Sequence, residues 1–213
     1  MDPATQVAAK VGWARRRARL PGCADLVVSV LPPRLALTFD DGPDPTGTPA
    51  VLDALGTAPG TFFVLVDRTE SQPGLVREIV DRGNRIGLHG DRHDRVDLVP
   101  AHLLAIRLRD AARRLEDVSG QEVRLFRPPY GRASWRTFLA TRRAGLQLAL
   151  WSHDPRDWEP GASDRIALCM VPGAIVLLHD GSLEQSGQVA TTAACVARLL
   201  PDAVRRGLRP VSL

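Results

Sequence analysis

Short apolar runs alternate with segments of helical spacing along most of the chain. Continuous apolar runs bounded by breakers are typical of buried strands, and they lie at Leu35–Phe39, Thr61–Val66, Arg85–Leu88, Val123–Phe126, Leu146–Trp151, Ala174–Leu178 and Arg209–Leu213. Between them apolar residues recur every three or four positions, which predicts helices at Pro49–Leu55, Pro73–Arg82, Pro100–Val118, Ser134–Ala144, Ser163–Cys169 and Val189–Arg206.

The alternation of strand and helix, without hairpin turn signals, predicts a parallel sheet with crossover helices. No internal repeat or interdomain linker interrupts it, and 213 residues suffice for one sizeable core. We therefore expect a single α/β domain over residues 34–213. Residues 1–33 would form an N-terminal arm, with a short helix over residues 4–19 and an irregular link to about Pro33.

Two adjacent carboxylates, Asp40 and Asp41, follow the first apolar run and precede Gly42-Pro43. Gly-Pro cannot continue a strand ladder, so both should lie where the strand ends. Neighbouring negative charges repel, and burial disfavours the ionised form of each. A metal ion or an arginine should therefore lie nearby, unless the pair is only a solvated turn.

Other unusual polar residues also follow predicted strands. They are His89 and His93 after the third strand, Arg127 after the fourth, Asp154 and Asp157 after the fifth, and His179 after the sixth. In a parallel barrel these strand ends share one face, where barrel enzymes carry their chemistry. The common placement of these residues at strand ends indicates a functional site and not a coincidence of sequence.

Composition and charge narrow the class of protein. The net charge is only +4, and the arginines are scattered, so nucleic-acid binding is not expected. Three cysteines without paired spacing suggest no disulfide framework. No run approaches the roughly 20 apolar residues that span a bilayer, and the N-terminus makes a poor signal peptide. We expect a cytoplasmic protein without stable membrane insertion.

His89 and His93 stand four residues apart, a spacing that would place both on one face of a helical turn. With Asp41 they would make a three-ligand site for zinc or a similar ion, with a fourth position open, as catalytic sites require. Two histidines on a solvated turn are the alternative. Asp41 arriving from another strand favours the metal site.

Three further stretches offer chemistry. Phe126–Gly131 contains two prolines and a glycine, so it is a stiff loop that can aim Arg127 and a backbone N–H. Trp151–Trp158 sets carboxylates beside aromatics that could line an apolar pocket. Ile175–Gly181 runs a buried strand into His179, which can titrate near neutral pH as an acid or base.

Taken together, these five stretches resemble the NodB-homology polysaccharide deacetylases, carbohydrate esterase family four. The family motifs T-F-D-D-G-P, H-[S/T]-x-x-H, R-x-P-Y, D-x-x-D-W and L-x-H correspond, in order, to Thr38–Pro43, His89–His93, Arg127–Tyr130, Asp154–Trp158 and Leu177–His179. The resemblance covers roughly residues 34–213. It implies a distorted (β/α) barrel, usually seven-stranded, and metal-dependent removal of acetyl groups from N-acetylglucosamine-type saccharides.

The resemblance also implies catalytic and metal-binding roles at the matching positions. The metal, zinc or otherwise cobalt or nickel, would be held by Asp41, His89 and His93. Asp40 would be the general base, oriented by Arg127. His179 would be the general acid, and Asp157 would tune it.

The remaining implied roles concern the substrate. The backbone N–H of Tyr130 would stabilise the oxyanion, and Pro129 belongs to the same substrate-binding loop. Trp158 and Leu177 would line the pocket for the acetyl methyl group. The partner would be an N-acetylated oligosaccharide or glycoside.

The sequence departs from the family pattern at Gly90, which stands where the family has Ser or Thr. The missing hydroxyl is expected to loosen the metal-binding motif. Two other functions stay open: a related metal-dependent amide hydrolase acting on a small non-sugar substrate, and a catalytically silent carbohydrate-binding domain. The intact set of ligands, acid and base argues against the second.

Overall fold

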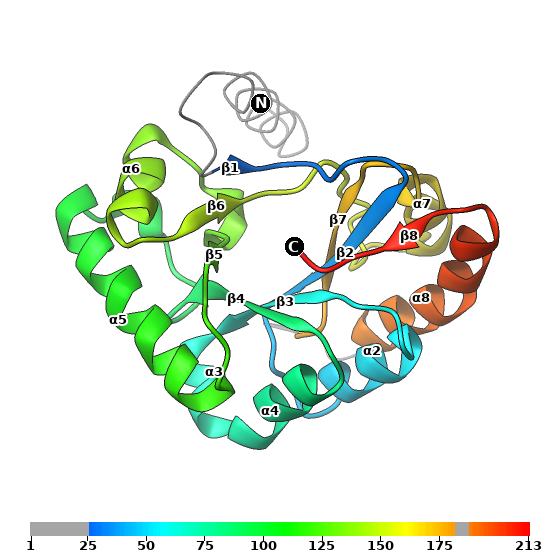
Figure 1. Ribbon diagram of the computed structural model, residues 1–213, viewed down its shortest axis with the longest axis horizontal. Helices are drawn as coiled ribbons and strands as arrows, with labels where there is room; N and C mark the ends of the chain where they lie inside the picture. Colours follow the sequence, from blue (N-terminus) through cyan, green and yellow to red (C-terminus); the bar gives the residue numbers. More distant parts are fainter. Residues whose placement is uncertain (1–25, 182–187) are drawn as a thin grey trace.

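The computed structural model describes residues 26–181 and 188–213, and its parallel sheet curls into an incomplete barrel (Figure 1). The strands in this part of the chain are β1 (Leu26–Val27), β2 (Arg34–Asp40), β3 (Thr61–Leu65), β4 (Arg85–Gly90), β5 (Leu125–Phe126), β6 (Gln147–Ala149), β7 (Ile175–His179) and β8 (Arg209–Pro210). Their order is β1-β6-β5-β4-β3-β2-β7, and β8 pairs with β2 off this path. The predicted α/β barrel of parallel strands is confirmed.

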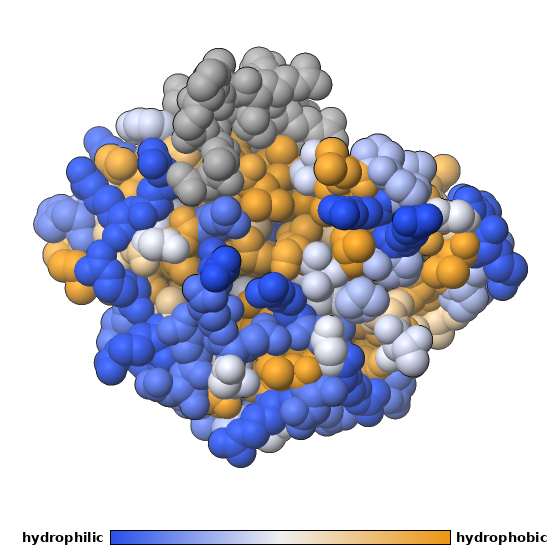
Figure 2. Space-filling model, in the orientation of Figure 1, coloured by the Kyte–Doolittle hydropathy of each residue, from blue (hydrophilic) through white to orange (hydrophobic). Residues whose placement is uncertain are grey.

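Helices surround the outside of the curled sheet (Figure 1). They are α2 (Gly47–Leu55), α3 (Val66–Ser71), α4 (Pro73–Asp81), α5 (Ala101–Ser119), α6 (Trp135–Arg143), α7 (Ala162–Cys169) and α8 (Gln188–Arg205), with 3₁₀ turns η1 (Val96–Leu98) and η2 (Pro129–Gly131). Figure 2 shows hydrophilic residues over the left and lower margins of the molecule and hydrophobic residues near the middle of the same face. This distribution follows from amphipathic helices that turn their apolar stripe toward the sheet.

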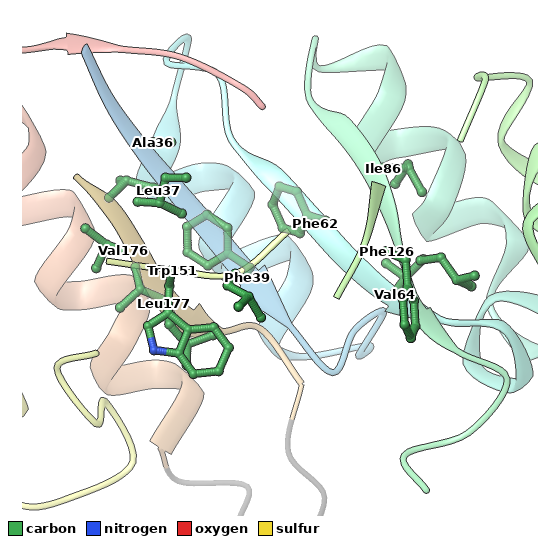
Figure 3. Close-up of a cluster of buried hydrophobic side chains, with 14 of the residues drawn as sticks. Ala36, Leu37, Phe39, Phe62, Val64, Ile86, Phe126, Trp151, Val176 and Leu177 are labelled. Atoms are coloured by element: carbon green, nitrogen blue, oxygen red, sulfur yellow. The ribbon is translucent and has the colours of Figure 1, made fainter. Parts of the chain in front are cut away.

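The central strands are buried on both faces, which explains their nearly continuous apolar sequences. All residues of β3, and all of β2 except Arg34, are buried. The rings of Phe39 and Phe62 stack on neighbouring strands with centroids 5.0 Å apart (Figure 3). This packing fixes β2 at the centre of the domain, and with it the position of the carboxylates at its end.

The gap between the two edges of the sheet is bridged in places. His153 forms an isolated parallel bridge with Val176 of β7, and the Val30 N–H donates to the carbonyl of Gly173. The C-terminus lies within the curve of the sheet (Figure 1), where the Leu213 N–H donates to the Thr61 hydroxyl at 2.9 Å. These contacts hold the barrel curved without a full closing ladder.

Two elements differ from the sequence prediction. The link predicted as irregular contains β1, whose Leu26 pairs with Leu148 of β6; two residues are too few to show periodicity. Helix α3 begins directly after β3 and was missed, because no breaker separates the two. The helix predicted over residues 4–19 lies outside the described residues, and the domain boundary at residue 34 stays a prediction. In residues 26–181 and 188–213, no helix has both the length and the apolar character needed to cross a membrane.

Candidate active site

Strand register brings the predicted polar residues together at the carboxyl ends of the strands. Asp40, the last residue of β2, is the register partner of His179, the last residue of β7. On the other side, Leu88 of β4 pairs with Phe126 of β5, which places His89 beside Arg127. Segments far apart in sequence therefore contribute to one cluster.

Asp40 is held by a fully buried arginine inside the barrel. Arg127 donates from Nη1 to Asp40 Oδ1 at 2.8 Å and to the Thr38 hydroxyl at 2.7 Å. Its guanidinium lies 4.0 Å from the ring centroid of Phe63, a cation–π contact. Burial lowers the pKa of Arg127 and Asp40 opposes that shift. The arrangement orients the Asp40 carboxylate and leaves its second oxygen available.

Asp41 turns the other way because its backbone is left-handed, with φ of 73°. Its Oδ1 lies 3.3 Å from Nε2 of His89 and 3.5 Å from Nε2 of His93. This buried oxygen has no hydrogen-bond partner among the described residues. Burial would raise the pKa of Asp41, but the neighbouring histidines outweigh it and lower the pKa to about 2. Asp41 is therefore ionised at any physiological pH.

His89 is oriented by the backbone. Its Nδ1 lies 2.8 Å from the carbonyl oxygen of Arg127, an acceptor, so Nδ1 carries the proton and Nε2 faces Asp41. Burial lowers the pKa of His89, but Asp40 and Asp41 outweigh burial, and the net pKa is raised. The pKa of His93 is lowered, mainly by burial. The carboxylates thus favour positive charge at His89, where a proton and a metal ion would compete, whereas at His93 burial outweighs them.

The two histidines do not share a helical turn, so that part of the prediction is wrong. His89 belongs to β4, which continues to Gly90, and a bend follows. Gly90 has φ of +119°, a conformation that side chains rarely adopt. This reversal, not helical periodicity, brings the rings of His89 and His93 to a centroid distance of 5.4 Å.

The loop after β5 covers His93. Tyr130 has φ of 58°, and its ring contacts that of His93 edge-on with centroids 4.2 Å apart. Pro129, in the same turn, is buried. A Cβ on Gly131, whose φ is +58°, would lie 2.5 Å from the indole of Trp151, so this position requires glycine. The stiff loop predicted from its prolines therefore does border the candidate metal ligands.

On the opposite side, His179 forms a tight pair with buried Asp157. His179 Nδ1 lies 2.7 Å from Asp157 Oδ1, and the His179 backbone N–H donates to Oδ2 at 2.8 Å. The Thr192 hydroxyl also donates to Oδ2. Burial lowers the pKa of His179, but Asp157 outweighs burial and raises it to about 10. His179 is therefore protonated at neutral pH.

Two predicted pocket residues flank this pair. The ring of Trp158 meets that of His179 edge-on at 5.0 Å between centroids, and about 40% of Trp158 is exposed. Leu177 is buried two residues before His179 on β7. An exposed indole beside a protonated imidazole can contact a bound ligand.

Two residues of the site were missed by sequence analysis. Arg68 of α3 donates to the Asp41 carbonyl at 2.7 Å. Asp180 is fully buried, accepts from the Thr48 hydroxyl at 2.5 Å and would clash with any side chain at Gly42. Burial raises the pKa of Asp180 to about 7. Both follow strand ends, so extending the strand-end rule to β3 and to the residue after His179 would have found them.

The donor set fits a divalent metal ion. One ligand atom from each of Asp41, His89 and His93 lies within 4.8 Å of the others. Asp41 and His89 are buried, and the unpartnered Asp41 oxygen lies within 3.5 Å of both imidazole Nε2 atoms. One carboxylate and two imidazoles suit zinc and its neighbours among the transition metals.

The fold and site define a class: a parallel barrel with a candidate metal centre and two carboxylate-paired groups, Arg127 and His179, at the carboxyl ends of its strands. Residues 29–149, more than half of the chain, match the polysaccharide deacetylase family. The chain belongs to this family.

Individual relatives agree with this assignment. The chain is 37% identical over 187 residues to a peptidoglycan-N-acetylglucosamine deacetylase of Bacillus cereus, covering 84% of this chain and 85% of that protein. It is 37% identical over 185 residues to a chitooligosaccharide deacetylase of Bradyrhizobium, covering 80% and 84%. A crystal structure of a peptidoglycan N-acetylglucosamine deacetylase superposes with a TM-score of 0.78 at 28% identity, covering 88% of this chain and 90% of that one.

Proposed function

We propose that this protein is a metal-dependent N-deacetylase that hydrolyses the acetamido group of N-acetylglucosamine-type saccharides to free amine and acetate. The family membership and the relatives named for peptidoglycan and chitooligosaccharide deacetylation support it. The observation that carries the proposal is the divergence of Asp40 and Asp41. One carboxylate faces Arg127, and the other faces two histidines.

Asp41, His89 and His93 would hold the metal ion, with zinc the best fit and cobalt or nickel as alternatives. When bound, such an ion acts as a Lewis acid that lowers the pKa of water and polarises an amide carbonyl. Asp41 is ionised, and Nδ1 of His89 donates to a carbonyl, so these ligands need little rearrangement.

Asp40 acts as the general base. Its Oδ1 is bonded to Arg127, while Oδ2 lies 3.9 Å from Nε2 of His89, on the side of the metal ligands. The arginine compensates the buried carboxylate with an opposite charge and fixes its direction. Oδ2 can then accept the proton of the water that attacks the acetamido carbon.

The loop at Tyr130 stabilises the charge that develops on the carbonyl oxygen. Tyr130 has a left-handed backbone and its ring contacts His93, so its N–H would be the donor that this loop contributes beside the ligand cluster. Loss of one such donor typically costs about 3–4 kcal/mol of transition-state stabilisation. Pro129, buried in the same loop, restricts the movement of the loop.

His179 acts as the general acid. It is protonated at neutral pH, and Asp157 fixes the ring through Nδ1, so Nε2 carries the proton that the departing amine needs. Trp158 and Leu177 form the wall for the acetyl methyl group beside this histidine.

Acetate release from N-acetyl-chitooligosaccharides tests the proposal. The protein is treated with a chelator, and zinc, cobalt or nickel is then restored. We expect activity to disappear on chelation and to return with at least one metal. A protein that binds metal but releases no acetate from any N-acetylated sugar would instead act on another amide. A protein that does neither would be the silent carbohydrate-binding domain.

A further inference from the structure

The bend that carries His93 is tied to the outer helices by a charged network. Asp91 stands between the two histidines, and its carboxylate lies between two arginines of α5. Arg107 donates from Nε to Asp91 Oδ2 at 2.6 Å, and Arg114 donates from Nη1 to Oδ1 at 3.1 Å. The arginines are seven residues apart, two helical turns, so they project from the same face of α5.

The network extends beyond Asp91. Arg107 also reaches Asp94 through Nη2 at 2.8 Å, and Arg114 is bound to Glu70 of α3 at 2.6 Å. The Asp67 N–H, in the first turn of α3, donates to the Asp91 carbonyl at 3.1 Å. The bend is thereby fastened to α3 and α5 at both its backbone and its side chains.

His93 needs such support more than His89 does. His89 lies in a strand, and its Nδ1 is bonded to a backbone carbonyl, whereas the buried Nδ1 of His93 has no hydrogen-bond partner among the described residues. The residue after His89 is Gly90, which has no side chain to brace the turn. The direction of His93 therefore depends on where the backbone of residues 91–94 is held, together with the ring of Tyr130.

We infer that Asp91, clamped by Arg107 and Arg114, is a positioning residue that holds His93 in place to bind the metal. It compensates for the missing side chain at Gly90. Single surface ion pairs contribute little, but a carboxylate that takes one arginine on each oxygen has fixed geometry. The inference rests on the proposed metal site and deepens it.

The test measures metal binding, not turnover. Zinc affinity is determined by competition with a chromophoric chelator, and the visible spectrum of the cobalt-loaded protein reports ligand geometry. The single variants are Asp91→Ala, Asp91→Glu and Arg107→Ala. The double variant combines Asp91→Ala with Arg107→Ala. Asp53→Asn is the matched control, because it removes an arginine-bound carboxylate on α2, away from the bend. Thermal unfolding in chelator shows whether each variant is folded.

Asp91→Ala should bind zinc roughly 10-fold or more weakly, the effect typical of support around metal ligands, and its cobalt spectrum should change. Asp91→Glu should recover part of the affinity. The double variant should lose less affinity than the two single losses combined, since both changes break one network. If Asp91→Ala is folded and keeps the zinc affinity and cobalt spectrum of the wild type, the inferred role of Asp91 is wrong, and the proposed metal site is unaffected. Failure of the wild-type protein to bind any divalent ion overturns the proposed metal site as well.

Discussion

Asp40 and Asp41 are consecutive residues whose carboxylates face different partners: Asp40 Oδ1 accepts from Arg127, while Asp41 Oδ1 faces the Nε2 atoms of His89 and His93. The left-handed backbone at Asp41 produces this divergence at the end of β2. Each charge has its own compensation, so two adjacent carboxylates can be buried together. The division also makes their roles separable by mutation.

Asp40→Asn should retain zinc and lose turnover. The change keeps the size of the side chain and leaves Asp41, His89 and His93 untouched, but an amide cannot accept a proton from water. Loss of a general base typically costs about 10²–10⁴-fold in rate. Zinc titration and acetate release on the same sample check both halves. A rate equal to that of the wild type would assign the base elsewhere.

His93→Ala should lose zinc while the domain stays folded. The side chain lies in a bend at the barrel mouth and is not part of the hydrophobic core. His102→Ala is the control, since His102 is an exposed residue of α5. Equilibrium dialysis against zinc measures the loss. Equal zinc content in the two variants would contradict the assignment of His93 as a ligand.

Arg127→Met should destabilise the fold strongly. Removing one partner of a buried pair leaves an uncompensated charge, which typically costs about 3–5 kcal/mol, and Asp40 would be that charge. Adding Asp40→Asn should restore part of the stability, although activity stays lost. Urea unfolding in the presence of a chelator measures the free energy of unfolding of the single and the double variant. Arg82→Met serves as control, because the Arg82 pairs with Asp53 and Glu78 lie at the surface.

The pair of His179 and Asp157 should make stability depend on pH. The folded pKa of about 10 lies above the ordinary value of 6.5, so the stabilisation is complete below pH 6.5 and is lost as pH rises through 10. Between about pH 7.5 and 9 the chelated wild type should lose more stability than His179→Gln. His89, whose pKa is also raised, is present in both proteins and cancels in the comparison. Parallel curves would show that the pKa of His179 is not raised.

Sequence patterns could predict most residues of the candidate site because four long buried strands, β2, β3, β4 and β7, are apolar runs whose ends are visible in the sequence. They could not show β1, which has two residues, or α3, which follows β3 without a break. The local geometry at Gly90 was also out of reach, since spacing alone suggests a helical turn. Contacts such as that of Asp91 with Arg107 depend on how α5 packs against the bend, and no local sequence pattern predicts this packing.

Gly90→Ser should weaken the metal site, although it restores the residue type that the family motif has at this position. The φ of +119° is strained for any L side chain, and the new Cβ would lie 3.2 Å from the Arg92 carbonyl oxygen. Backbone strain of this kind typically costs about 1–3 kcal/mol, and relieving it would shift the bend that carries His93. We expect weaker zinc binding and a lower melting temperature.

Gly83→Ser is the control, because Gly83 also has positive φ, +80°, but nothing lies within 4 Å of its Cβ and it is remote from the ligands. It should lower stability and leave zinc affinity unchanged. Tighter zinc binding by Gly90→Ser would mean that the bend readily adopts another backbone path, and that the added hydroxyl braces it better than the network around Asp91 does.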